Sequence, residues 1–150
     1  MDVEEIARIA VDCGFKLHER LGPGLLESVY EMILFESLKR RGLNVQRQVS
    51  IRVEYDDFII EDAFRLDLLV EDKLIIELKS VEASAPVHKK QLLTYLRLTN
   101  RSLGLLMNFG MATFREGCDR VVNKHTNFAP SRLRVSQKDA AELIGAVEIT

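Results

Sequence analysis

The sequence predicts an α/β fold with its elements in the order ααβββαββ, and two kinds of periodicity support that prediction. Apolar residues recur at helical spacing from residue 3 to 21 and from about residue 25 to 41, and Gly22-Pro23-Gly24 separates the two stretches. Residues 45–55 instead alternate between apolar and polar side chains, which is typical of a strand with one buried face. The chain is therefore expected to open with two helices and then enter a sheet.

Apolar runs between turn residues predict the remaining elements. They are a hairpin over residues 64–80, a helix over about 86–99, a strand over 102–109 and a short strand over 120–123. After a loose linker over 124–134, Ser136 with Asp139 resembles a capping box for a short terminal helix. We accordingly expect one domain over residues 1–123 and a C-terminal tail with a short helix over residues 124–150.

Composition indicates a soluble, globular protein. Of 150 residues, 47% are hydrophobic and 29% are charged, and no apolar run approaches the ~20 residues of a membrane span. The acidic start MDVEEIARIAVDC lacks the basic region of a secretion signal, so we expect a cytoplasmic protein without a membrane segment. Two cysteines and three scattered histidines are too few for an iron–sulfur cluster or a structural zinc site. A net charge of -2 argues against a histone-like nucleic-acid binder but leaves room for local basic patches, such as Lys39 to Arg41 and Lys89-Lys90.

The hairpin over residues 64–80 carries charges among its apolar residues. If Glu71 to Lys73 form the turn, the register sets these pairs opposite each other: Leu68 and Ile76, Leu66 and Leu78, Asp67 and Glu77, Arg65 and Lys79. One face is then wholly apolar, and like charges oppose each other on the second face. Opposed side chains have Cβ atoms roughly 4.5 to 5.5 Å apart, and like charges at that separation destabilise a sheet.

Two interpretations of the charged face remain open from the hairpin alone. In the first, the face is solvated, and the diagonal pairs Asp67 with Lys79 and Arg65 with Glu77 are weak exposed ion pairs. In the second, the two carboxylates converge on a hard divalent cation, and Lys79 lies alongside to meet an anionic oxygen.

Two further polar sets lie on the predicted helices. Glu27 and Tyr30 share one face at the start of the second helix, and Gln91 and Tyr95 share one face of the later helix. Each set has an ordinary explanation. A Glu in a first turn interacts favourably with the helix dipole, and a polar helix face usually meets solvent.

Taken together, these residues resemble the GxxExxY family within the PD-(D/E)XK nuclease superfamily. The resemblance is carried by GLLESVY at Gly24 to Tyr30, RLDLLV around Asp67, IIELK ending at Lys79, QLLTY at Gln91 to Tyr95 and LGLLMNFG at Leu103 to Gly110. It extends from about Ile6 to about Val122. One departure is Leu66, which stands where the superfamily name expects proline.

The resemblance implies a restriction-endonuclease-like α/β core, with a central mixed β-sheet flanked by helices, and metal-dependent hydrolysis of phosphodiester bonds. The implied substrate is nucleic acid, with DNA expected, the implied cofactor is Mg²⁺ or Mn²⁺, and a homodimer is expected by analogy. The implied metal site consists of Asp67, Glu77, Glu27 and the main-chain carbonyl of Leu78. Lys79 would be the catalytic lysine beside those three acidic residues, and Gln91, Tyr95 and Tyr30 would contact the substrate.

The chemistry of hydrolysis is consistent with these roles. Attack on a phosphodiester builds negative charge on the phosphoryl and leaving oxygens, and Mg²⁺ offsets it while needing only a few carboxylates because it retains several waters. The main alternative is a nuclease-like module that binds nucleic acid or protein and has little or no activity. A third is a structural interaction protein, which leaves the polar set unexplained. The complete set of expected metal-site residues favours the enzyme.

Overall fold

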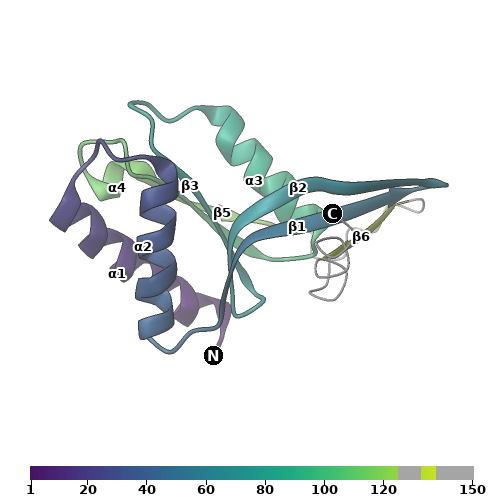
Figure 1. The fold of residues 1–150 in the computed structure, drawn as a ribbon, viewed down its shortest axis with the longest axis horizontal. Coiled ribbons are helices and arrows are strands. Elements are labelled where there is room, and N and C mark those ends of the chain that lie inside the picture. Colours follow the sequence, from purple (N-terminus) through teal and green to yellow (C-terminus); the bar gives the residue numbers. More distant parts are fainter. Residues whose placement is uncertain (125–132, 138–150) are drawn as a thin grey trace, which may run out of the picture.

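The computed structural model describes residues 1–124 and 133–137, which form a sheet with helices on both faces (Figure 1). The elements are α1 (Val3–Leu21), α2 (Glu27–Arg40), β1 (Val45–Tyr55), β2 (Phe58–Val70), β3 (Leu74–Lys79), α3 (Pro86–Leu98), β4 (Leu103–Asn108), α4 (Phe114–Gly117), β5 (Cys118–Val122) and β6 (Leu133–Gln137). The predicted order is confirmed for the elements that it contains, and the structure adds α4 and β6. The strand before the β2–β3 turn is longer than predicted, because β2 begins at Phe58.

The sheet is mixed, as the predicted fold class requires. Its six strands lie in the order β5-β4-β3-β2-β1-β6, and β3 and β4 are parallel while every other neighbouring pair is antiparallel. Parallel neighbours need a crossover connection, and α3 provides it between β3 and β4. The end of β3 and the start of α3 therefore lie at the same edge of the sheet.

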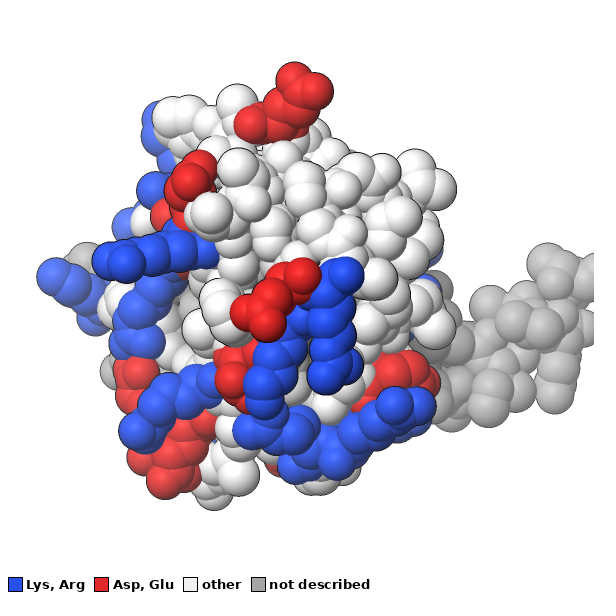
Figure 2. Space-filling model, turned by 90° about the vertical axis from the view of Figure 1, so that its left-hand side faces the viewer, with Lys and Arg blue, Asp and Glu red and all other residues white. Residues whose placement is uncertain are grey.

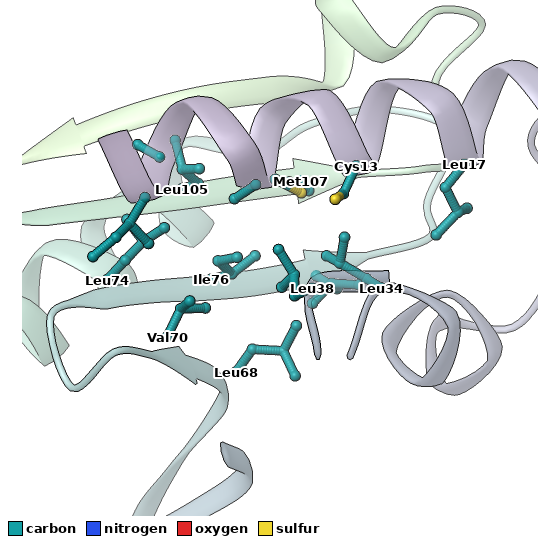
Figure 3. Close-up of a cluster of buried hydrophobic side chains, with 14 of the residues drawn as sticks. Cys13, Leu17, Leu34, Leu38, Leu68, Val70, Leu74, Ile76, Leu105 and Met107 are labelled. Carbon is teal, nitrogen blue, oxygen red and sulfur yellow. The ribbon is translucent and has the colours of Figure 1, made fainter. Parts of the chain in front are cut away.

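The helices α1 and α2 cover one face of the sheet. Figure 3 shows Cys13 and Leu17 of α1 and Leu34 and Leu38 of α2 directed toward the strands, where Ile76 and other apolar side chains meet them. All five side chains are buried, and burying a Leu or Ile side chain stabilises the fold by about 1.5 to 3 kcal/mol. This packing fixes α2 over β2 and β3.

The helix α3 covers the opposite face. Its Leu92 and Leu96 are fully buried and pack in a second cluster that includes Leu69 and Ile75. Gly104 on β4 allows the close approach, because a Cβ atom there would lie 2.9 Å from Cδ1 of Leu92. The sheet is thus buried on both faces in its centre, which accounts for the continuous apolar run in β3.

The predicted register of the β2–β3 hairpin is confirmed near the turn. Leu68 pairs with Ile76, and the two following pairs toward the turn also form as predicted. The pairing stops there, so the predicted pairs of Asp67 with Glu77, of Leu66 with Leu78 and of Arg65 with Lys79 do not form a ladder. The prediction of one apolar face is wrong at Leu66, because Leu66 packs with α3 while Leu68 and Leu78 pack with α1 and α2.

This change of face coincides with an irregularity in the backbone of the neighbouring strand. The β1–β2 pairing includes Arg47 with Leu68 and Val49 with Leu66, but it omits Gln48 and Asp67 between them. Gln48 has a φ of 50°, a left-handed conformation that is uncommon for a residue other than glycine. Leu68 and Leu66 lie on either side of this unpaired position and pack against opposite layers.

The strand β6 falls in the region predicted as a linker and tail. It pairs antiparallel with β1, with Ser136 opposite Arg52, so Ser136 is a strand residue and not the N-cap that the sequence predicted. The rest of the predicted terminal helix, including Asp139, lies outside the described residues. Among the helices of residues 1–124, none is both long enough and apolar enough to cross a membrane.

Candidate active site

Two carboxylates lie where β2 and β3 separate. The backbone N–H of Asp67 donates to Oε1 of Glu77 at 3.1 Å, and the backbone N–H of Leu78 donates to Oδ2 of Asp67 at 2.9 Å. Side-chain carboxylates thus accept hydrogen bonds from backbone groups of the facing strand just beyond the last ladder pair. The hairpin fold therefore brings the acidic groups of Asp67 and Glu77 together through these contacts, although the ladder pair that the sequence register predicts between them does not form.

Glu77 lies in an environment that disfavours its charge. Its side chain is only 6% exposed, and the pKa of its carboxyl group is raised well above the usual value, first by burial and then by the negative charge of Asp67. The charge of Lys79 acts in the opposite direction and lowers this pKa. A bound cation would favour the charged forms of these two neighbouring carboxylates and so stabilise the site.

Glu27 lies at the rim of this pair, in the first turn of α2. Its side chain is exposed, yet desolvation of its carboxyl group raises its pKa, Lys79 lowers it, and Asp67 and then Glu31 raise it further. The described residues contain no group of three His, Cys, Asp or Glu side chains already arranged to hold a metal ion. The acidic site is therefore a close pair formed by Asp67 and Glu77. Glu27 lies nearby, and the three residues do not form a closed metal cage.

The loop before α2 is fixed by Tyr30. This side chain is fully buried, its ring stacks on Phe109 with centroids 4.6 Å apart, and its hydroxyl donates to the carbonyl of Gly22 at 2.5 Å. The hydroxyl also accepts from the N–H of Leu25 at 3.2 Å. The structure therefore does not support the prediction that Tyr30 contacts substrate, because its hydroxyl is already engaged inside the protein.

The same loop is attached to the end of β3. Gly24 has a φ of 112°, which a glycine adopts without strain, and the hydroxyl of Ser80 donates to the carbonyl of Leu25 at 2.6 Å. This contact places the start of α2, and with it Glu27, beside the residue that follows Lys79. The three positions of the GLLESVY segment thus have different tasks, since the glycine shapes the loop, Glu27 faces the site and Tyr30 anchors the helix.

Lys79 ends β3 and is half-buried, and buried Asn108 fixes the chain that follows it. Asn108 pairs with Lys79 across the parallel strands, and its Oδ1 accepts from the N–H groups of Val81 at 3.1 Å and Gly110 at 3.0 Å. A side chain at position 110 does not fit, because a Cβ atom there would lie 2.3 Å from the carbonyl oxygen of Val81. The sequence analysis missed Asn108, which a polar residue at the end of an otherwise apolar strand could have indicated.

The helix α3 brings Tyr95 to the same site. Its ring stacks on Phe64 of β2, with centroids 4.4 Å apart and planes 9° apart. The pKa of its phenol is raised by burial first and then by the charges of Glu77 and Asp67. Gln91 lies one helical turn earlier and is exposed, so α3 presents Tyr95 near the carboxylates and Gln91 at the surface.

A second set of polar residues, which the sequence analysis missed, adjoins the pair on the side of α2. Glu31 is only 4% exposed and accepts from Nε of Arg47 at 3.0 Å and from Nε2 of Gln48 at 2.7 Å. These residues, with Leu26, Glu27 and Ser28, line a hollow of about 460 Å³. The spacing of Glu31, four residues after Glu27 on one helix face, was the available signal.

The asymmetric distribution of basic residues is visible on the face shown in Figure 2. Lys and Arg side chains gather in the lower part of that face, on the side of the molecule where α1 and α2 lie. A groove of about 450 Å³ is lined in part by Lys16, Arg20, Arg40 and Arg41. Arg40 and Arg41 of the predicted patch thus line this groove, where Arg41 and Lys16 both pair with Asp12. Lys89 of the other predicted patch forms an ion pair with Asp119 at 3.4 Å.

The donor set at the carboxylate pair fits a hard divalent cation. Asp67 and Glu77 carry carboxylate oxygens, the donor type that such a cation prefers, and its charge would offset both their repulsion and the burial of Glu77. Mg²⁺ retains several waters and is bound in many proteins through one or two carboxylates, so a closed cage is not required. The pair formed by Asp67 and Glu77 therefore suits Mg²⁺ without a third acidic group.

A mixed sheet flanked by helices, with an Asp, a Glu and a Lys where two strands separate, defines an α/β protein with a carboxylate–lysine site. The family model described as the PD-(D/E)XK nuclease superfamily matches residues 4–121, and the chain belongs to that superfamily. Nucleases of this superfamily generally use divalent metals and act on nucleic acid. Comparison with curated proteins gives no match, and comparison with solved structures gives none either.

Proposed function

We propose that this protein is a metal-dependent nuclease that hydrolyses phosphodiester bonds, with DNA as its substrate, and that it represents the GxxExxY type within its superfamily. The observation that supports this most strongly is the opening of the β2–β3 ladder at Asp67 and Glu77. A solvated charged face would not bury Glu77 beside a second carboxylate. The arrangement is easiest to understand as a site prepared for a cation.

Asp67 and Glu77 would hold Mg²⁺ or Mn²⁺ in this proposal. Glu27 would join them directly or through a water, and the main-chain carbonyl of Leu78 is a further oxygen next to Glu77 in the chain. The bound cation would supply electrostatic stabilisation for the charge that develops on the phosphate. The remaining chemistry falls to side chains of this chain.

Lys79 would serve the reacting groups directly. Its ammonium group lies close enough to affect the carboxyl groups of Glu27 and Glu77, so it can orient the attacking water or stabilise the anionic phosphoryl oxygen. In the overall reaction, water adds to phosphorus, the bond to one ester oxygen breaks, and a phosphate monoester and a hydroxyl group result. Tyr95 and Gln91 would hold the nucleic acid from α3.

A cleavage assay tests this proposal. Single- and double-stranded DNA and RNA are incubated with the protein in Mg²⁺, in Mn²⁺ and in excess chelator. We expect cleavage of DNA only with metal, and about a 100-fold or greater loss of rate in Lys79→Ala and Glu77→Ala. The controls are Lys73→Ala for the lysine variant and Glu82→Ala for the glutamate variant. Each removes an exposed residue of the matching charge and should retain the parent rate. Cleavage that persists in chelator would overturn the metal mechanism.

A second candidate function is a binding module that retains the nuclease fold with little activity. It is favoured by the absence of a ready three-group metal cluster in the part of the chain that the structure describes. It predicts metal-independent binding of nucleic acid or protein without cleavage. The expected homodimer and cytoplasmic location stay predictions, and light scattering after gel filtration tests the first.

A further inference from the structure

Gln48 has a backbone conformation that its residue type does not favour. Its φ of 50° lies in the left-handed region, within the strand β1 and at the point where the β1–β2 pairing omits Gln48 and Asp67. Such a conformation is sterically unfavourable for residues other than glycine, and residues held in it are concentrated at functional sites. A glycine would relieve this strain, so a reason for glutamine must lie in its side chain.

The Gln48 side chain does not contribute to either apolar core. It is exposed, and the two hydrophobic clusters contain its neighbour Val49 but not Gln48. Its interactions are polar. Nε2 donates to Oε1 of Glu31 at 2.7 Å and to Oδ1 of Asp67 at 3.3 Å, so one amide group joins α2 to the carboxylate pair.

The partner on α2 is itself firmly held. Glu31 is buried, and its second oxygen accepts from Nε of Arg47 at 3.0 Å. A buried carboxylate with two fixed donors changes position little, and it therefore provides a rigid acceptor for the Gln48 amide. The hydrogen bond to Glu31 therefore fixes the position of the amide group that also donates to Asp67.

The contact completes the fixation of the Asp67 carboxylate. Oδ2 of Asp67 accepts from the N–H of Leu78, and Oδ1 accepts from Gln48, so each oxygen has a donor. Two donors on different oxygens restrict rotation of the carboxylate about its last torsion. Carboxylate oxygens have further lone pairs, which remain available to a cation.

We propose that Gln48 is a positioning residue that orients Asp67 for the divalent cation, with Glu31 and Arg47 as its support. This inference rests on the proposed function, because it assumes that Asp67 is a metal ligand. Partners of metal ligands commonly affect affinity by 10- to 100-fold without touching the metal. The strain at Gln48 is retained because glycine could not supply the amide.

The decisive variant is Gln48→Gly, because the two roles predict opposite results for it. It removes the amide and also relieves the left-handed backbone. We expect the metal-free variant to melt at the parent temperature or above it, while its Mn²⁺ affinity, measured by calorimetry, falls about tenfold. Gln46→Gly is the matched control, since it removes the same side chain from the same strand, and its Mn²⁺ affinity should equal that of the parent.

The outcomes separate this inference from the proposed function. If the parent binds Mn²⁺ and Gln48→Gly binds it equally well, the positioning role is wrong and the metal site stands. If Gln48→Gly melts well below the parent, Gln48 is an element of folding and the inference is also wrong. If the parent itself does not bind Mn²⁺, the proposed function fails first, and the assignment of Gln48 fails with it.

Discussion

Asp67 and Glu77 face each other across two strands whose ladder has just ended, and each carboxylate accepts a hydrogen bond from the backbone of the other strand. The distances are 3.1 Å from the N–H of Asp67 to Glu77 and 2.9 Å from the N–H of Leu78 to Asp67. The fold tolerates this pair although burial and mutual repulsion oppose the charge of Glu77. The stability and activity of the protein should therefore depend on how that charge is neutralised.

The stability of the metal-free protein should depend on pH through Glu77. Because the folded-state pKa of Glu77 is raised, the folded protein retains this proton at pH values where the unfolded chain has lost it. The contribution is fully present below the usual pKa of 4.5 and is lost as pH rises toward the folded-state pKa. Melts of the parent and Glu77→Gln in chelator, from about pH 5 to about pH 8, measure this. We expect the difference between them to grow with pH in favour of Glu77→Gln, and a constant difference would contradict the assignment.

Changes on α3 should affect substrate more than metal. Tyr95→Phe keeps the ring that stacks on Phe64 but removes the hydroxyl near the carboxylates, and Gln91→Ala removes an exposed amide. We expect each to raise KM for an oligonucleotide severalfold, since one hydrogen bond contributes about 0.5 to 1.5 kcal/mol. Calorimetry should give parent-like Mn²⁺ affinity for both. Loss of Mn²⁺ binding in either variant would show that the division of roles is wrong.

Tyr30→Phe should destabilise the fold and spare the site. The change removes the hydrogen bonds to the carbonyl of Gly22 and the N–H of Leu25, and because these residues are partly or largely exposed, each lost bond costs about 0.5 to 1.5 kcal/mol. The melting temperature should fall by about 2 to 4 °C for each kcal/mol. Tyr55→Phe, at an exposed tyrosine, is the control and should melt with the parent. Activity per folded molecule should be retained, and its loss at full stability would restore a substrate role for Tyr30.

The sequence could predict those parts of the site that depend on short-range pattern. Asp67, Glu77 and Lys79 lie on two apolar strands joined by a tight turn, so periodicity and turn position were enough to place the acidic pair together. The class of the fold followed in the same way, because two helical repeats precede alternating and apolar strands. The strand β6 was not predicted, because five residues are a weak pattern and their pairing with β1 is long-range.

Other features depend on backbone geometry that the sequence pattern does not predict. Leu66 packs with α3 although strict alternation places it with Leu68, and this change of face occurs beside the left-handed Gln48. The same conformation brings Gln48 to Glu31, a contact between a helix and a strand that sequence spacing does not encode. The prediction of a substrate role for Tyr30 did not foresee its internal contacts, because sequence spacing does not show whether a tyrosine serves packing or chemistry, and here its ring and hydroxyl are both used inside the protein.

The central claim is that Asp67 and Glu77 form a cation site, and thermal melts of the parent and Glu77→Gln in chelator and in Mn²⁺ test it most directly. In chelator, Glu77→Gln should melt higher by about 1 to 4 °C at neutral pH, because a cross-strand like-charge pair costs about 0.2 to 1 kcal/mol and burial adds to it. Mn²⁺ at about 100 times its Kd should stabilise the parent by about 2.7 kcal/mol and hardly move the variant, which reverses the order. Glu82→Gln, which neutralises an exposed residue, should follow the parent in both conditions. A variant that melts with the parent in chelator and shifts equally with Mn²⁺ would contradict the account.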